Sequence, residues 1–447
     1  MLFVYVSFDC YLAVSGRLGF VITQTLFKTR GAGDGFRRFE FTRNKQTVRI
    51  APIRVIDMTD LHPFEGATNR TATFVCKVGN SVTQWPVPYE TWKLKSGMKI
   101  NEATELSEVR RCVSIQKMGA IPMTDGVSNS AWLTAPTEAI PGLRKVMGSS
   151  SIRAHAGVCT WMNGVFWLKS VRAESKGRTH ITNWGDVGKI KVETLDTIVE
   201  EGLVYPLIRG RDVHRWKSKP SVHILLTQDP TTRTGVDETT MKSKYPRTYT
   251  YLLRFEEALR KRPGYVKYFD SRKDPFWTIY NVGEYSVSPF RVVFKELTDF
   301  FQSAVLPTVA GKPAIADTKL RFIESDSADE AYFVAGLLNS APAILYLYST
   351  ATWVQTADYQ ASDISRLKLP KFSKSDPAHE AVVKISKKCH KAAENESIAA
   401  VAALEQELDQ PVREIWEIST NDMQAIRQSL MELGFPASQP DMEEIED

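Results

Sequence analysis

The sequence predicts an α/β fold that combines the last strands of a doubly wound sheet, a longer α+β region and a set of C-terminal helices. Three observations predict this fold. Apolar runs of strand length alternate with a Gly-rich turn in the first 80 residues, and shorter strand-like runs separated by turns follow from residue 85 to residue 372. Beyond Pro370 the apolar residues recur with helical spacing to about Leu433. The 447 residues allow two or three domains, and the 43% hydrophobic content excludes a wholly disordered chain.

The first apolar segment, from Phe3 to Val14, resembles a signal peptide only superficially. It lacks a positively charged start and is interrupted by Asp9, so we expect a buried segment of a cytoplasmic protein. It is too short to cross a bilayer, and no other run approaches about 18 apolar residues, so we expect no membrane span. The five cysteines form no C-x-x-C pair. This favours a reducing cytoplasm and argues against a thiolate metal site.

The next elements have the order expected at the end of a doubly wound sheet. Leu18–Ile22 is a near-continuous apolar run, which predicts a strand buried on both faces of a parallel sheet. A loop at Gly31–Gly35 follows, and Phe36–Phe39 is expected to open a short helix. Val48–Ile56 and Thr71–Val78 are expected to be two further strands.

The proline-rich stretch Trp85–Tyr89 is a rigid break, so we expect the first domain to end at residue 84. The α+β region would then occupy residues 85–372, the helical segment residues 373–434, and an acidic, disordered tail residues 435–447. Within the α+β region we expect a turn-rich stretch at 122–141, helices at 102–115, 248–261 and 329–339, and strands at 164–171, 222–227 and 286–294.

The charge is polarised along the chain, although the formal total is only +5. Residues 205–273 contain 16 Lys/Arg against 7 Asp/Glu, whereas residues 394–447 contain 2 against 14. The basic region also carries aromatic residues, as nucleic-acid surfaces do, because cations neutralise phosphates and rings stack on bases. A solvated basic face with core aromatics explains the same composition, and both readings stay open. These aromatic residues are Trp216, Tyr245, Tyr249, Tyr265 and Tyr268.

Several common catalytic motifs are absent from the sequence. It has no G-x-x-x-x-G-K-[ST] loop, no G-x-S-x-G elbow and no H-E-x-x-H pair, which argues against phosphate-loop nucleotidases, α/β-hydrolases and zinc proteases. The Gly31–Gly35 loop is one residue short of a dinucleotide pattern, and a surface turn is the favoured interpretation. Arg37 and Arg38 directly after it could meet a phosphate.

Six segments occur in a fixed order between about residue 11 and about residue 390. They are Gly16–Gln24, Gly31–Phe39, Pro63–Val78, Tyr205–Trp216 with the sequence YPLIRGRDVHRW, Pro313–Ser340 (in two pieces) and Ile364–Phe372. Together they resemble adenine-specific DNA amino-methyltransferases of type II and IIG restriction-modification systems. Tyr205–Trp216 is similar to a block of the family's target-recognition region, and Pro63–Val78 to its segment beside the flipped base. Thr23 stands where the family usually has proline.

The resemblance implies a Rossmann-like methyltransferase sheet followed by a target-recognition domain. It also implies methyl transfer from S-adenosylmethionine to the amine of an adenine flipped out of duplex DNA. The family's acidic residue with G-x-G and its N-P-P-[YF] loop do not occur here. We therefore expect the recognition half, which does not bind the cofactor or catalyse alone. Truncation and a separate catalytic chain both remain open as explanations.

The resemblance also assigns roles to individual residues. Phe64 would stack on the flipped base, with Asn69 and Thr71 lining the pocket; a core position for Phe64 and a polar turn for the other two are the alternatives. Among the cationic candidates, phosphate or structural roles are favoured over base reading. The candidate DNA contacts are Arg209, Arg211, Arg215, Lys217, Lys319, Arg37 and Arg38, with Asp212 expected to hold a neighbouring arginine in place.

Two rival interpretations come from other classes. The chain could be a non-enzymatic DNA-binding specificity subunit of a phage-defence system, or a gene fragment that folds poorly because Leu18–Ile22 exposes a strand edge. A partner that carries N-P-P-[YF] should restore methyl transfer if the chain is part of an enzyme, but not if it is a specificity subunit. Insolubility of the isolated chain would indicate a gene fragment.

Overall fold

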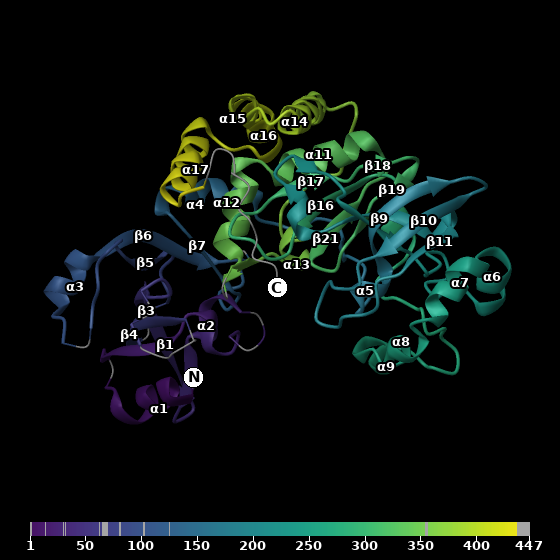
Figure 1. The fold of residues 1–447 in the computed structure, drawn as a ribbon. Helices are drawn as coiled ribbons and strands as arrows, with labels where there is room; N and C mark the ends of the chain where they lie inside the picture. Colours follow the sequence, from purple (N-terminus) through teal and green to yellow (C-terminus); the bar gives the residue numbers. More distant parts are fainter. Residues whose placement is uncertain are drawn as a thin grey trace.

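The computed structural model contains two lobes that are joined by helices (Figure 1). One lobe holds the N-terminal sheet, and the other holds two sheets and the helices around them. Helices α14 (Pro377–Glu394), α15 (Ile398–Glu407), α16 (Asp409–Trp416) and α17 (Thr420–Glu432) lie across the top. The structure describes residues 2–13, 15–29, 31, 33–61, 63–64, 70–79, 82–101, 103–124, 126–353 and 356–435. The expected acidic tail therefore lies almost wholly outside the described residues.

The N-terminal sheet has the strand order β1-β4-β3-β5-β6-β7, with β2 paired to β3. All of its pairs are antiparallel except β3 with β5. Because β1 and β3 are each antiparallel to β4, they run in the same direction. The strands are β1 (Arg17–Thr23), β2 (Glu40–Arg43), β3 (Gln46–Asp57), β4 (Thr71–Gly79), β5 (Val87–Leu94), β6 (Val113–Pro122) and β7 (Trp132–Ala135).

The mixed α/β fold is confirmed, and the strands expected at Val48–Ile56 and Thr71–Val78 lie within β3 and β4. The prediction that Leu18–Ile22 is a parallel strand buried on both faces is wrong. β1 is the end strand of the sheet, pairs antiparallel with β4, and contains no fully buried residue. Val21 is 48% exposed on the face opposite the core. An apolar run thus predicts a strand, but it does not reveal whether both of its faces are covered.

The sheet continues past residue 84, where we expected the first domain to end. β5, β6 and β7 all belong to it, so the paired strands extend to Ala135. Trp132 of β7 is fully buried and stacks on Phe27 with ring centroids 4.6 Å apart. The turn-rich stretch expected at 122–141 therefore contains a core strand. The helix expected at 102–115 is only α3 (Leu106–Cys112), because the chain enters β6 at Val113, where the β-branched Val113 and Ile115 favour a strand.

Two sheets form the centre of the other lobe. The larger has the order β11-β10-β9-β15-β12-β20, and its β12 and β20 are parallel. The smaller has the order β17-β16-β21-β8. The larger sheet contains β9 (Trp167–Glu174), β10 (Arg178–Asn183), β11 (Asp196–Glu200), β12 (Val204–Ile208), β15 (Val222–Leu225) and β20 (Ile315–Ala316). The smaller contains β8 (Ala154–Ala156), β16 (Arg291–Lys295), β17 (Ser303–Val305) and β21 (Leu320–Glu324).

Short helices flank the larger sheet (Figure 1). The single helix expected at 248–261 is two helices, α7 (Pro246–Leu253) and α8 (Glu256–Arg260). The break turns Phe255 inward, where it is buried together with Leu259. A third helix, α9 (Pro263–Tyr268), follows at once. The apolar spacing of residues 248–261 thus indicates helix correctly, but the chain changes direction between α7 and α8.

The C-terminal helices do not form a separate body. α11 (Ala328–Leu338), as expected at 329–339, packs with α12 (Ala341–Thr350) and α14 to α17 around one large core. This core also includes Trp216 and residues of α4 (Ile140–Val146). No single helix among the described residues is long and apolar enough to cross a membrane; the bent pair α11 and α12 reaches that length and hydropathy together.

Candidate functional site

A polar cavity of about 410 Å³ opens at the carboxyl ends of β1 and β3. Gln24 directly follows β1, and Asp57 is the last residue of β3. In α/β sheets ligands usually bind at the carboxyl ends of strands that share a direction. β1 and β3, on either side of the antiparallel β4, share that direction. Tyr89 of β5, together with Lys28, completes the inner wall, and the volume is within the range of small-molecule sites.

A hydrogen-bond network fixes the inner wall of the cavity. The Tyr89 hydroxyl donates to the Asp57 carboxylate at 2.5 Å, and the backbone N–H of Thr59 donates to the same carboxylate at 2.9 Å. The Gln24 amide approaches the Tyr89 hydroxyl at 3.4 Å. Burial, and then Asp57, raise the pKa of Tyr89 well above its ordinary value. The phenol therefore keeps its proton and acts as a hydrogen-bond donor.

Lys28 links the N-terminal sheet to α12 at the cavity wall. Its ammonium donates to the Thr134 hydroxyl at 2.7 Å and to the Ser349 backbone carbonyl at 2.6 Å. Burial lowers the pKa of Lys28 to about 7, although Asp57 opposes this shift. A buried amine that titrates near neutrality, inside a cavity with a carboxylate, marks a candidate site for a polar ligand.

The segment Pro63–Val78, which resembles the family's segment beside the flipped base, contributes to this cavity. Arg70 within the segment and Asp60 just before it both line the cavity wall. Phe64 is 48% exposed, so it does not pack in the core beneath the following strand. Thr71 is half-buried and begins β4 opposite Thr23, whereas Asn69 lies outside the described residues. The stacking role of Phe64 stays a prediction.

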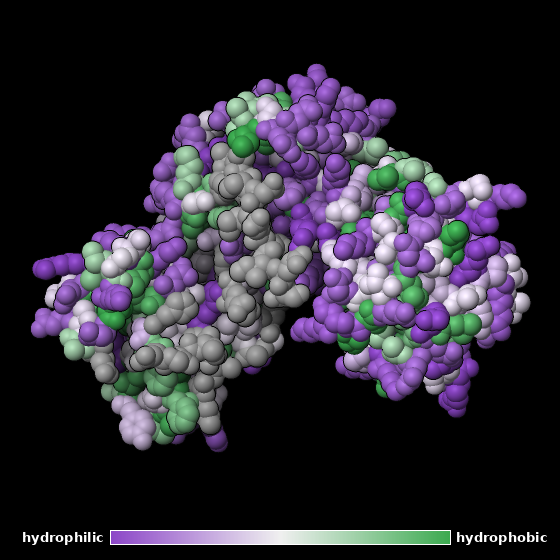
Figure 2. Space-filling model, in the orientation of Figure 1, coloured by the Kyte–Doolittle hydropathy of each residue, from purple (hydrophilic) through white to green (hydrophobic). Residues whose placement is uncertain are grey.

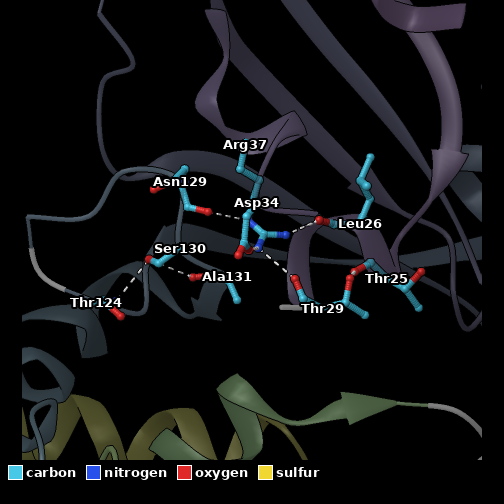
Figure 3. Close-up of polar contacts among 9 residues, drawn as sticks. All are labelled: Thr25, Leu26, Thr29, Asp34, Arg37, Thr124, Asn129, Ser130 and Ala131. Atoms are coloured by element: carbon cyan, nitrogen blue, oxygen red, sulfur yellow. Dashed lines mark hydrogen bonds and ion pairs between the residues drawn. The ribbon is translucent and has the colours of Figure 1, made fainter. Parts of the chain in front are cut away.

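Arg37 is not a surface contact, which corrects its assignment to DNA binding (Figure 3). It is fully buried, and its guanidinium donates to the backbone carbonyl of Thr29 at 2.8 Å, to that of Asn129 at 3.1 Å and to that of Leu26. It also pairs with the Asp34 carboxylate at 2.6 Å. All these partners belong to the protein, so Arg37 holds the loop after β1 against the β6–β7 turn. Arg38, its neighbour, is exposed.

The structure brings two of the family-like segments together. Arg209 and Arg211 follow β12, and Lys319 follows β20 after a buried Asp317. Because β12 and β20 are adjacent and parallel, both turns lie at the same sheet edge, where the Asp317 N–H donates to the Ile208 carbonyl at 2.9 Å. Arg211 and Lys319 are exposed there. We call this edge, residues 209–211 and 317–319, the basic edge.

Asp212 holds Arg209, as expected. The Asp212 carboxylate accepts from the Arg209 backbone N–H at 2.9 Å and from its guanidinium at 3.4 Å. The guanidinium also donates to Ser221 at 2.9 Å and lies 5.0 Å from the Trp184 ring centroid. Arg209 is thus held by Asp212, Ser221 and Trp184, and Arg211 and Lys319 are the more exposed cations of the basic edge.

Arg215 and Lys217 pair with carboxylates of the C-terminal helical segment; the burial of the Arg215 pair corrects its assignment as a DNA contact, whereas the assignment of Lys217 stays a prediction. Arg215 pairs with Glu405 of α15 at 2.8 Å, and only 16% and 6% of these two side chains are exposed. The indole N–H of Trp216 donates to the same carboxylate at 2.5 Å. Lys217 pairs with Glu396 at 3.0 Å. Trp216 and Tyr265 of the basic region are core residues.

The sequence did not single out Lys28, Asp57 or Tyr89. Asp57 does carry a detectable signal, because a carboxylate that ends a predicted strand is a frequent ligand position. Lys28 carries none, since its burial depends on Ser349, which is 321 residues away. No group of metal-ligating side chains occurs in the part of the chain that the structure describes.

The fold is similar to that of part of one solved restriction-modification enzyme. The type IIL enzyme MmeI, solved in complex with DNA, aligns with 96% of this chain and 51% of its own, at a TM-score of 0.51 and 10% identity. A type II methyltransferase, M.NspV from Nostoc sp., is 27% identical over 177 residues, which are 39% of this chain and 35% of that protein. The chain thus spans about half the length of MmeI and about a third of the length of M.NspV. The type IIG endonuclease BpuSI aligns at a TM-score of only 0.31. No protein-family profile matches the chain.

Proposed function

We propose that the chain is the DNA-recognition part of an adenine-specific DNA methyltransferase and that it acts on duplex DNA. The observation that carries this proposal is the polar cavity at the carboxyl ends of β1 and β3, whose wall includes Arg70 of the segment that resembles the family's segment beside the flipped base. The similarity to a type II methyltransferase and to the fold of MmeI supports it. The exposed cations of the basic edge, Arg211 and Lys319, supply contacts to phosphates.

In this proposal Phe64, which is 48% exposed and lies in the sequence between the cavity-lining residues Asp60 and Arg70, stacks on an adenine that has left the duplex. The residues present do not fit S-adenosylmethionine as the family binds it. Asp57 is an acidic residue at the end of a strand, but its carboxylate already accepts from Tyr89 and Thr59, and no G-x-G turn follows it. Cofactor binding and the N-P-P-[YF] contacts therefore come from a different polypeptide segment, and this chain binds and orients DNA.

Duplex binding by the 447-residue chain tests the proposal. We expect the logarithm of the association constant to fall linearly with the logarithm of the salt concentration, as phosphate contacts require. Lys319→Ala should weaken binding to all sequences alike and reduce the salt slope by about 1. Lys388→Ala, which removes an exposed lysine from α14 far along the chain, is the matched control and should change neither quantity.

Methyl transfer separates the proposal from a purely DNA-binding protein. The chain alone should transfer no labelled methyl group to DNA, and addition of a polypeptide that carries N-P-P-[YF] and the G-x-G motif should restore transfer. Absence of duplex binding at low salt would refute the recognition role. Transfer by the chain alone would refute the need for a second segment, and duplex binding without restored transfer would indicate a non-enzymatic specificity subunit.

A further inference from the structure

Three aromatic side chains from separate segments form a compact cluster near the basic edge. Trp161 stacks on Tyr268 with ring centroids 5.6 Å apart and planes 17° apart, and Tyr268 stacks on Tyr280 at 5.5 Å and 20°. Trp161 and Tyr280 are also 5.6 Å apart. Tyr268 is 52% exposed and Tyr280 is 42% exposed. We call Trp161, Tyr268 and Tyr280 the ring cluster; nearly half of its tyrosine surface faces solvent.

One buried arginine holds the three segments of the ring cluster in place. The guanidinium of Arg262 donates to the Thr160 carbonyl at 2.8 Å, next to Trp161, and to the Thr278 carbonyl at 2.8 Å, two residues before Tyr280. Arg262 itself directly precedes α9, which carries Tyr268. Burial lowers the pKa of Arg262 to about 10, so it remains charged at neutral pH. The cluster is therefore positioned before any ligand arrives.

The Trp161 ring also packs closely against the backbone of α9 at Gly264. Trp161 has a left-handed backbone with φ of 52°, which is uncommon for a large residue. Its ring lies so near Gly264 of α9 that a Cβ there would be 1.9 Å from it. Glycine at 264 thus allows the Trp161 ring to lie flat against the helix, beside Tyr268. The left-handed backbone of Trp161, the glycine at 264 and the buried Arg262 thus all hold the ring cluster in its position.

The surroundings of the ring cluster are basic. Residues 260–273 contain six Lys/Arg against one Asp/Glu. The ammonium of Lys267 lies 5.0 Å from the Tyr268 ring centroid, and Lys273 is exposed nearby in the sequence. Ion pairs within this stretch involve Arg260, Lys261 and Arg272, but not Lys267 or Lys273, among the described residues. This charge is complementary to a polyanion and unfavourable for a basic partner.

The ring cluster is continuous with the basic edge. Val158 bridges Asp317, and its N–H donates to the Ala316 carbonyl at 2.8 Å. The next residue, Cys159, exchanges two backbone hydrogen bonds with Tyr280, at 3.0 and 2.9 Å. Figure 2 shows hydrophobic residues set among hydrophilic ones on the lobe that carries α6 to α9. One bound polyanion could therefore contact both the cations and the rings.

We propose that the ring cluster is a stacking surface for an unpaired nucleobase of the bound DNA, with Lys267 and Lys273 neutralising the adjoining phosphates. Exposed rings beside cations are the usual means of binding unpaired bases, because every base has an aromatic face. This surface shares no residue with the lining of the cavity at the ends of β1 and β3. The proposal rests on the proposed function only in taking DNA as the partner.

The test compares a perfect duplex, the same duplex with one bulged 2-aminopurine, and a single strand that carries 2-aminopurine. The full chain should bind the bulged duplex more tightly than the perfect one and quench the bulged base. Tyr268→Ala/Tyr280→Ala should lose roughly 5- to 150-fold in affinity for the bulged duplex and abolish the quenching, as loss of one stacked base predicts. Tyr268→Phe/Tyr280→Phe should retain both properties. Tyr11→Ala, which removes an 80% exposed tyrosine elsewhere, is the matched control.

The outcomes separate this inference from the proposed function. Equal binding and quenching by the chain and its double alanine variant would overturn the inference, while duplex binding still supports the recognition role. Tyrosine-dependent binding of the single strand without duplex binding would support the inference and refute the recognition role. If the variant changes only self-association in sedimentation, the rings form a contact between copies of the chain, and the inference is wrong. Binding of none of the three DNAs would overturn both.

Discussion

Removal of Arg215 should destabilise the protein in a manner that depends on pH. Arg215 and Glu405 are largely buried and 2.8 Å apart, so Arg215→Met leaves the carboxylate with the Trp216 N–H as its remaining close donor. Loss of one partner from a buried pair costs about 3–5 kcal/mol of unfolding free energy. Lys217→Met is the matched control, because its partner Glu396 is 80% exposed, and it should cost about 0–1 kcal/mol.

The pH dependence follows from the carboxyl that is left behind. Burial already raises the pKa of Glu405, Arg215 opposes this shift, and the substitution therefore raises the pKa further. Between the unfolded pKa near 4.5 and this higher folded pKa, the native state binds the extra proton, so stability increases as pH falls. The penalty should shrink by up to about 1.4 kcal/mol for each pH unit in this window.

Chemical denaturation of the wild type, Arg215→Met, Glu405→Gln and the double variant at pH 5 to 8 measures these quantities. Glu405→Gln should show no such pH dependence, since it removes the titrating group, and the double variant should cost less than the sum of the single variants. A penalty for Arg215→Met below about 1 kcal/mol at pH 8, or one that is constant from pH 5 to pH 8, would refute the assignment of a buried pair.

Three further predictions concern other buried groups. Arg37→Ala should cost at least about 3 kcal/mol, because three carbonyls and a carboxylate lose their donor, whereas Arg38→Ala should change stability by about 0.5 kcal/mol or less; denaturant midpoints compare them. The wild type should gain stability relative to Lys28→Met as pH rises from about 7 to 10, since the folded pKa of Lys28 is below its unfolded value and the unfolded state binds more protons there; titrated unfolding free energies check the sign. Gly264→Ala should cost about 1–3 kcal/mol by displacing the Trp161 ring, and an unchanged near-ultraviolet circular dichroism spectrum would contradict it.

The pattern of apolar residues predicts those strands and helices whose formation depends on neighbouring residues alone. Thr71–Val78 is such a strand, because its alternating apolar and β-branched residues suit a half-buried strand whichever strand it pairs with. The same logic failed for Leu18–Ile22, since strand neighbours are a tertiary property. The resemblance assigns Arg215 and Lys217 to DNA, and local pattern does not reveal their carboxylate partners, which lie almost 200 residues away. The sequence does show a basic middle and an acidic end, but it does not show that the two meet.

The bond between Lys28 and Ser349 also bears on how the protein is made. These residues are 321 positions apart, and a ribosome that adds roughly 5–20 residues per second needs on the order of 16–64 s to synthesise the stretch between them. Throughout that time the Lys28 amine of the nascent N-terminal sheet cannot donate to the Ser349 carbonyl. The cavity can close only after α12 emerges from the exit tunnel. Slowing translation upstream of α12 should therefore prolong the exposure of the nascent sheet to chaperones and proteases.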